Sequence, residues 1–166
     1  MKHILDKICV KSGVFCPSCQ RKIESKIVDE DEIPVIRTLM DLEDELKFLS
    51  KKGEYIKSII TEDEIFVIIK NGFEMNEINI LERNLTRELG KKVKVIESTG
   101  DTRKLIEKII SPASLLGINR VWIPGGMEIL NIRVSRRDRK LLERNRESYE
   151  MLIEKLLGIK TQIVFE

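Results

Sequence analysis

The chain has 166 residues, of which 42% are hydrophobic and 35% charged, and its formal net charge is +2. This length fits one ordinary domain or two very small ones, and the composition allows a buried core. No apolar run approaches the length of a membrane span, and the N-terminus "MKHILDKICV" lacks the apolar core of a signal peptide. We therefore expect a cytoplasmic protein that does not contact a membrane.

The small net charge hides two strongly charged stretches. Residues 29–45 carry eight acidic side chains against one base, Arg37. The segment "SRRDRKLLERNRES", residues 135–148, is the most one-sidedly basic part of the chain. The sequence thus predicts an acidic end and a basic end, and the basic end is a candidate surface for an anionic partner.

All three cysteines and the single histidine lie in residues 1–30, which we expect to form a small knuckle before the rest of the chain. An odd number of cysteines argues against a disulfide framework. The spacing Cys9-x6-Cys16-x2-Cys19 includes one "CPSC" motif, and CxxC supplies half of many tetrahedral Zn²⁺ sites. Cys9 is then the candidate third ligand and His3 the fourth, unless two protomers of a homodimer share one metal. The alternatives are a redox-active dithiol and free thiols in a small core.

Residues 35–98 read as helix, strand, strand, helix, strand. Leucines at three- and four-residue spacing predict a helix from about Val35 that stops before Gly53. The β-rich runs "YIKSII" and "IFVIIKN" flank the polar turn "TEDE" and predict a hairpin. A second amphipathic helix ends at Gly90, and "KKVKVIES" alternates like a strand.

Residues 101–166 repeat this order. "TRKLIEKII" predicts a short helix, and "INRVWI" and "EILNIRV" flank the turn signal "PGGM". Apolar residues from Leu142 to Leu157 predict one long helix that ends at Gly158, and "KTQIVF" predicts the last strand.

The two halves align with a simple register. The hairpin strands "YIKSII" and "IFVIIK" correspond to "NRVWI" and "ILNIRV", and the segment through Gly90 corresponds to the one through Gly158. We therefore predict an α+β fold of two consecutive α-β-β-α-β units, each a small three-stranded sheet packed by helices, in residues 35–98 and 101–166. The second unit is slightly longer, and its extra residues fall between its second and third strands. The alternative is a chance likeness of short amphipathic elements.

The stretches "IFVIIKN…LERNLTRELGKKVKVIE" and "ILNIRVSRR…YEMLIEKLLGIKTQIVFE" resemble tandem type II KH domains, as in the archaeal NusA-like transcription factors. The resemblance covers residues 38–166. It implies an RNA-binding protein in which a GxxG loop brings the backbone close to about four nucleotides. This chain departs from that pattern, because the loop positions hold "NEIN" (Asn76 to Asn79) and "RNRE" (Arg144 to Glu147).

The second unit carries arginines and lysines where the glycine loop is missing. Guanidinium groups bind phosphates in a bidentate manner, so these arginine side chains are candidates to replace the phosphate contacts that the backbone of a GxxG loop makes. The alternative is a solvated helix face in which Asp138, Glu143 and Glu147 pair with the bases. The candidate RNA-binding residues are Arg136, Arg137, Arg139, Lys140, Arg144, Arg146, Arg120, Lys91 and Lys92.

Trp122, the only tryptophan, lies at the tip of the second hairpin. We interpret it as a core residue that covers the sheet edge, with a base-stacking platform beside Arg120 as the alternative.

The functional expectation is a non-enzymatic, NusA-like protein that acts in transcription elongation or termination, on the nascent transcript, or on ribosomal RNA. The alternative is an adaptor whose degenerate KH folds dock on RNA polymerase or the ribosome. An enzyme is not expected, because one histidine and no Gly-rich phosphate loop leave only the CxxC motif for chemistry.

Overall fold

The computed structural model describes residues 1–98 and 100–166 and divides into two compact units, Met1–Ser98 and Thr99–Glu166. We call them unit 1 and unit 2 and describe each by itself. Within the described residues, none of the helices has both the length and the apolar character needed to span a membrane.

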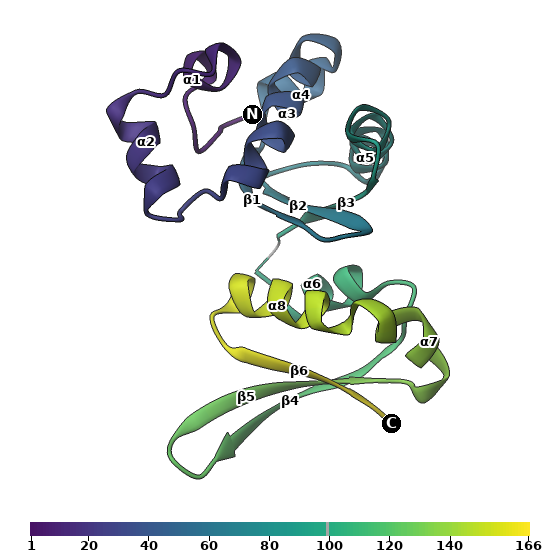
Figure 1. The fold of residues 1–166 in the computed structure, drawn as a ribbon. Helices are drawn as coiled ribbons and strands as arrows, with labels where there is room; N and C mark the ends of the chain where they lie inside the picture. Colours follow the sequence, from purple (N-terminus) through teal and green to yellow (C-terminus); the bar gives the residue numbers. More distant parts are fainter. Residues whose placement is uncertain (99) are drawn as a thin grey trace. The chain divides into compact units, whose positions relative to one another are not determined.

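Unit 1 contains a three-stranded sheet in the order β1-β2-β3, with β1 antiparallel and β3 parallel to the central strand. Helices α3 and α5 pack together over one face of this sheet (Figure 1). The elements are α1 (Lys7–Ser12), α2 (Pro17–Glu24), η1 (Glu30–Glu32), α3 (Ile33–Glu45), α4 (Lys47–Lys51), β1 (Glu54–Ile60), β2 (Glu64–Lys70), α5 (Met75–Leu89) and β3 (Lys92–Glu97).

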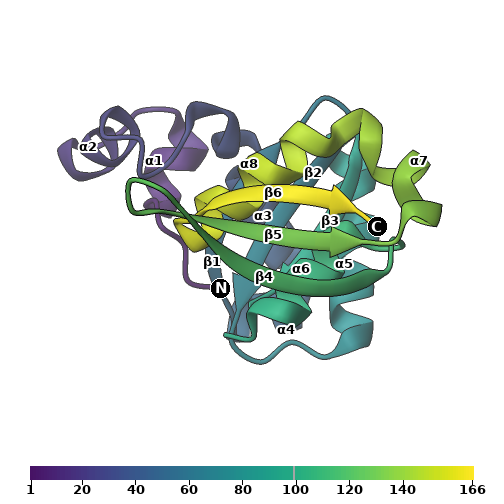
Figure 2. The same ribbon diagram turned by 90° about the horizontal axis from the view of Figure 1, so that it is seen from below.

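Unit 2 has the same arrangement, with the sheet order β4-β5-β6, β4 antiparallel and β6 parallel to β5. Figure 2 shows this sheet face-on, with β5 between β4 and β6. The elements are α6 (Thr102–Ile110), β4 (Leu115–Ile123), β5 (Met127–Val134), η2 (Arg136–Asp138), α7 (Arg139–Leu142), η3 (Glu143–Asn145), α8 (Arg146–Leu157) and β6 (Lys160–Phe165).

The predicted α+β fold with two small three-stranded sheets packed by helices is confirmed. Strand β3 begins at Lys92 and β6 at Lys160, so each follows its glycine, Gly90 or Gly158, at the same distance along the chain. The connection between the second and third strands spans residues 71–91 in unit 1 and 135–159 in unit 2. The longer connection of unit 2 therefore lies where the sequence places its extra residues.

Two helices that the sequence predicts as continuous are broken. The first helix stops at Glu45, because Leu46 is extended, and resumes as α4. The predicted long helix of unit 2 is instead the series η2, α7, η3 and α8. Residues 143–148 contain no apolar side chain that packing could hold in place, and Asn145, a residue type that favours helix caps, leaves the helical conformation before α8.

Residues 1–30, expected as a knuckle of their own, share the hydrophobic core of unit 1. Leu5, Cys9, Val10 and Cys19 are buried in one cluster with side chains of α3, α5 and the sheet. A backbone bridge between Lys2 and Glu54 also joins this segment to β1. The cysteine segment is therefore part of the first fold unit and not an appendage.

A buried carboxylate fastens the start of α3 to β1. The Glu32 side chain is 1% exposed and accepts hydrogen bonds from the Tyr55 hydroxyl (2.6 Å), the Lys57 ammonium (2.9 Å) and the Ser58 backbone N–H (2.8 Å). It also accepts a hydrogen bond from the backbone N–H of Asp29 at 2.8 Å. Burial, with the Glu32 carboxylate beside it, raises the pKa of Tyr55 well above its usual range, so the phenol stays a donor.

Replacing Glu32 by alanine should destabilise unit 1 by about 3 kcal/mol, because it leaves the Lys57 ammonium, the Tyr55 hydroxyl and the Ser58 N–H without their acceptor. The exposed neighbour Glu30 provides the matched control, and Glu30→Ala should change the stability by less than about 0.5 kcal/mol. Hydrogen exchange of the α3 and β1 amides measures both values. Equal effects of the two variants would contradict a structural role for the Glu32 contacts.

Candidate metal centre and basic surface

The three cysteines converge at one place in unit 1. The Sγ atoms of Cys9, Cys16 and Cys19 all lie within 4.8 Å of one another, and no disulfide joins them. Three thiolates around a tetrahedral Zn²⁺ with Zn–S bonds of about 2.3 Å lie about 3.8 Å apart, so the spacing fits a single metal ion after a small adjustment. The three cysteines can therefore hold a metal ion.

The local helix geometry sets these positions. Helix α1 ends at Gly13, whose left-handed conformation (φ 79°) turns the chain back toward α2. Cys16 is the N-cap of α2, with Pro17 in the first turn, and Cys19 follows one turn later. The turn and the first helical turn together bring Cys16 and Cys19 to Cys9.

Backbone N–H groups surround the sulfurs. The N–H of Asp6 donates to the Cys19 Sγ at 3.3 Å, and the N–H of Cys16 donates to the Cys9 Sγ at 3.3 Å. The N–H of Cys19 donates to Cys16, which lowers the pKa of the Cys16 thiol, while burial raises the pKa of Cys19. Of these two thiols, Cys16 is therefore the more readily ionised.

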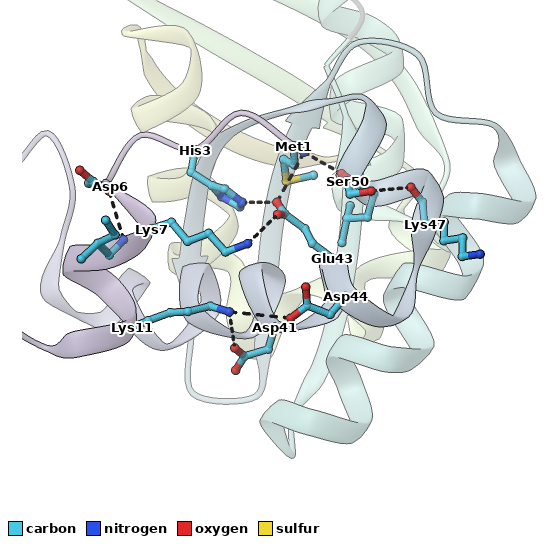
Figure 3. A network of polar contacts seen from close by, with 12 residues as sticks. Met1, His3, Asp6, Lys7, Lys11, Asp41, Glu43, Asp44, Lys47 and Ser50 are labelled. Carbon is cyan, nitrogen blue, oxygen red and sulfur yellow. Dashed lines mark hydrogen bonds and ion pairs between the residues drawn. The ribbon is translucent and has the colours of Figure 1, made fainter.

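His3, the predicted fourth ligand, does not belong to this group of three cysteines. Figure 3 shows the His3 ring directed at Glu43 of α3. The His3 Nε2 lies 2.5 Å from the Glu43 carboxylate. The same carboxylate lies 3.5 Å from the Met1 amine and 3.8 Å from the Lys7 ammonium. Burial lowers the pKa of His3, although Glu43 opposes this effect. His3 thus fastens the N-terminal residues to α3.

A redox dithiol of the thioredoxin type requires CxxC at a strand-to-helix junction. In unit 1 the motif instead follows helix α1 and a short turn. The surroundings of the CPSC motif therefore favour the metal-binding alternative over the redox one.

The basic segment of unit 2 follows β5 directly. Arg136 and Arg137 lie in η2, Arg139 and Lys140 in α7, and all four are exposed. Arg144 lies in η3 and Arg146 at the start of α8. The loop position inferred for unit 2, Arg144 to Glu147, thus falls on the junction of η3 and α8, whereas its counterpart in unit 1, Asn76 to Asn79, lies in the first turns of the continuous helix α5.

Acidic side chains nearby form ion pairs with only some of the arginines and lysines of this segment. Arg139 pairs with Glu143 at 3.0 Å and lies over the Phe165 ring, and Arg146 pairs with Glu150 at 2.9 Å. Asp138 accepts a hydrogen bond from the Ser114 backbone N–H at 2.8 Å instead.

Three basic side chains of the segment are not engaged in ion pairs with acidic residues of the described part of the chain. Within the described part of the chain, the side chains of Arg136, Arg137 and Lys140 have no hydrogen-bond or ion-pair partner. We call these three residues the open basic cluster. Unpaired, exposed positive charges so close together in the chain form a surface suited to an anionic partner.

The remaining candidates do not join this cluster. Arg120 lies on β4 and contacts Glu128 at 3.4 Å. Lys91 and Lys92 belong to unit 1, where Lys91 donates to the Thr61 carbonyl at 3.0 Å and Lys92 is exposed.

The interpretation of Trp122 as a core residue is wrong, because its side chain is 67% exposed. Trp122 pairs with Glu128 beyond the point where β6 begins, so no third strand covers that end of the hairpin within the described residues.

Comparison with known proteins defines the fold but not the function. No model of a known protein family matches the chain, and no curated protein matches it. A solved structure, "Crystal structure of APE1850", superposes with a TM-score of 0.56 at 18% sequence identity, over 79% of this chain and 96% of that one. At this identity the likeness shows a shared fold alone.

In metal-free protein, a thiol-alkylating reagent used below the ordinary thiol pKa should modify Cys16 first. Cys16 is half-buried and its pKa is lowered, whereas Cys19 is buried and its pKa is raised. Peptide mass spectrometry over a time course measures the order of modification. Modification of Cys19 before Cys16 would contradict the described thiol environment.

Proposed function

We propose that the protein binds RNA through the phosphate backbone, using the open basic cluster of unit 2 as its main contact. The observation that carries this proposal is that Arg136, Arg137 and Lys140 are exposed and unpaired at the start of the helical series η2–α7–η3–α8. The acidic residue that follows Arg137 in the chain, Asp138, accepts a hydrogen bond from the Ser114 N–H and, among the described contacts, pairs with none of these three cations.

The repeated α-β-β-α-β order supports a pair of KH-like units, in keeping with the sequence resemblance. In such units the segment between the second and third strands carries the nucleic-acid contact. In unit 2 this segment lacks the GxxG loop and is interrupted at η3, and its cations offer phosphate contacts from side chains. Arg139, Arg144 and Arg146 of the same segment would extend the contact, with Arg120, Lys91 and Lys92 as secondary candidates.

Such contacts read charge and not base sequence, so binding should depend steeply on salt and weakly on RNA sequence. A cytoplasmic, NusA-like role in transcription elongation or termination, or on ribosomal RNA, fits this mode. Contacts with RNA polymerase or the ribosome belong to the same proposal.

We also propose that the metal ion held by Cys9, Cys16 and Cys19 is Zn²⁺. Three thiolates close to tetrahedral spacing are typical of structural zinc sites. Because Cys9 and Cys19 also belong to the core of unit 1, the ion would stabilise the packing of α1 and α2 on α3.

The triple variant Arg136→Ala, Arg137→Ala, Lys140→Ala should weaken binding of a mixed-sequence single-stranded RNA about 100-fold at about 0.1 M salt. Three lost phosphate contacts should also make the slope of log Kd against log salt shallower by about 2. Fluorescence anisotropy over a salt series measures both quantities.

The matched control removes the same charge from an exposed face of α6, with Arg103→Ala, Lys104→Ala and Lys108→Ala. This variant should change the affinity by less than about threefold, since it alters only the long-range field. Equal losses of RNA affinity in the two triple variants would contradict the proposal, because net charge alone would then account for the effect. If the wild-type protein binds no RNA at low salt, the RNA-binding proposal is wrong, and the alternative of an adaptor that binds a protein partner takes its place.

Purified protein should contain one zinc ion per chain, and Cys9→Ser should abolish it, because two thiolates of a CxxC motif alone hold the ion weakly. Elemental analysis of gel-filtered protein gives the metal content. His3→Gln should retain the ion, since His3 contacts Glu43 and not the cysteines. Zinc-free wild-type protein that keeps its full stability would contradict the proposed zinc site.

A further inference from the structure

The cysteine site has three ligands from this chain and no fourth among the described residues. A closed structural zinc site has four protein ligands. Within residues 1–98 and 100–166, the group that includes Cys9, Cys16 and Cys19 contains no further cysteine, histidine, aspartate or glutamate. The sequence itself has no other cysteine to offer.

Two residues that precede the cysteines in the sequence and offer a ligand atom, His3 and Asp6, are already engaged. His3, the only histidine, has its Nε2 at Glu43, and this contact belongs to a network that includes the Met1 amine. The Asp6 carboxylate accepts the Ile8 backbone N–H at 3.1 Å and serves as the N-cap of α1. Recruiting either residue to the metal would require breaking one of these contacts.

The site lies at the surface of unit 1. Cys16 is half-buried, while Cys9 and Cys19 are buried. Two residues beside these cysteines in the chain are also exposed: Ile8, next to Cys9, is 77% exposed, and Val14, two residues before Cys16, is 76% exposed. Solvent or a partner's side chain can therefore approach this part of the molecule.

We propose that the fourth coordination position is open to ligands from outside the chain: water fills it in the free protein, and a neutral imidazole-type nitrogen donor can replace that water. This inference rests on the proposed zinc site. Zn²⁺ with three thiolates carries a net charge of −1, so a neutral donor adds no further negative charge, whereas a fourth thiolate would. Three thiolates and one imidazole form a common complete zinc site.

The exchange is a simple substitution. The imidazole nitrogen donates its lone pair to the metal, the bound water leaves to solvent, and no electron or proton is transferred.

Cobalt substitution tests this inference directly on the full chain. Co²⁺ added to metal-free protein should bind one ion per chain and show thiolate-to-metal charge-transfer absorption together with visible ligand-field bands. Titration with free imidazole should then shift the ligand-field bands saturably, with the charge-transfer absorption retained. His3→Gln should give the same initial spectrum and the same shift.

The failures of the two proposals are distinguishable. Absence of cobalt binding would overturn the zinc proposal and this inference together. Cobalt binding with no response to imidazole, or a spectrum changed by His3→Gln, would overturn only the inference, because the fourth position would then be filled from within the chain. One cobalt ion per two chains in a native mass spectrum would also overturn it, since the site would be shared between protomers.

Discussion

The main constraint on unit 1 is that a three-stranded sheet and two helices can bury only a small apolar surface. A unit of about 65 residues is marginal for this reason. Unit 1 meets the constraint by adding the N-terminal cysteine segment to the same core, through side chains such as Leu5, Val10 and Cys19. The buried Glu32 carboxylate then fixes the start of α3 against β1. Cys9 and Cys19 therefore belong to this core, and together with Cys16 they form a group that can hold a metal ion.

Unit 2 has the same order of elements but uses the connection between its second and third strands differently. In unit 1 that connection is built on the continuous helix α5, whereas in unit 2 it is longer and interrupted at η3. The interruption separates η2 and α7 from the part of α8 that packs in the core. Arg136, Arg137 and Lys140 lie between β5 and this interruption, and their side chains are unpaired among the described residues. This local difference between two similar units is the physical basis of the proposed RNA contact.

The strands were predictable from the sequence, because alternation, turn residues and the stops at Gly90 and Gly158 are local signals. The convergence of the cysteines was also predictable from their spacing. Two predictions from the local pattern failed. Leu46 interrupts a helix despite its apolar spacing, and Trp122 is exposed at the end of a hairpin that extends past the start of β6. The contact between His3 and Glu43, far apart in the chain, has no local signal at all. The role of Glu32 could not be predicted, because Glu32 belongs to a run of acidic residues, and such a run is typical of a solvated surface.

The central claim is that the open basic cluster contacts RNA phosphates through its side chains. Arginine side-chain Nε resonances, followed by NMR during titration with a single-stranded RNA, test it most directly. The account predicts saturable shifts for Arg136 and Arg137, and none for Arg103, which is exposed on α6 and paired with Glu107. Saturable binding without shifts at Arg136 and Arg137 would contradict the account.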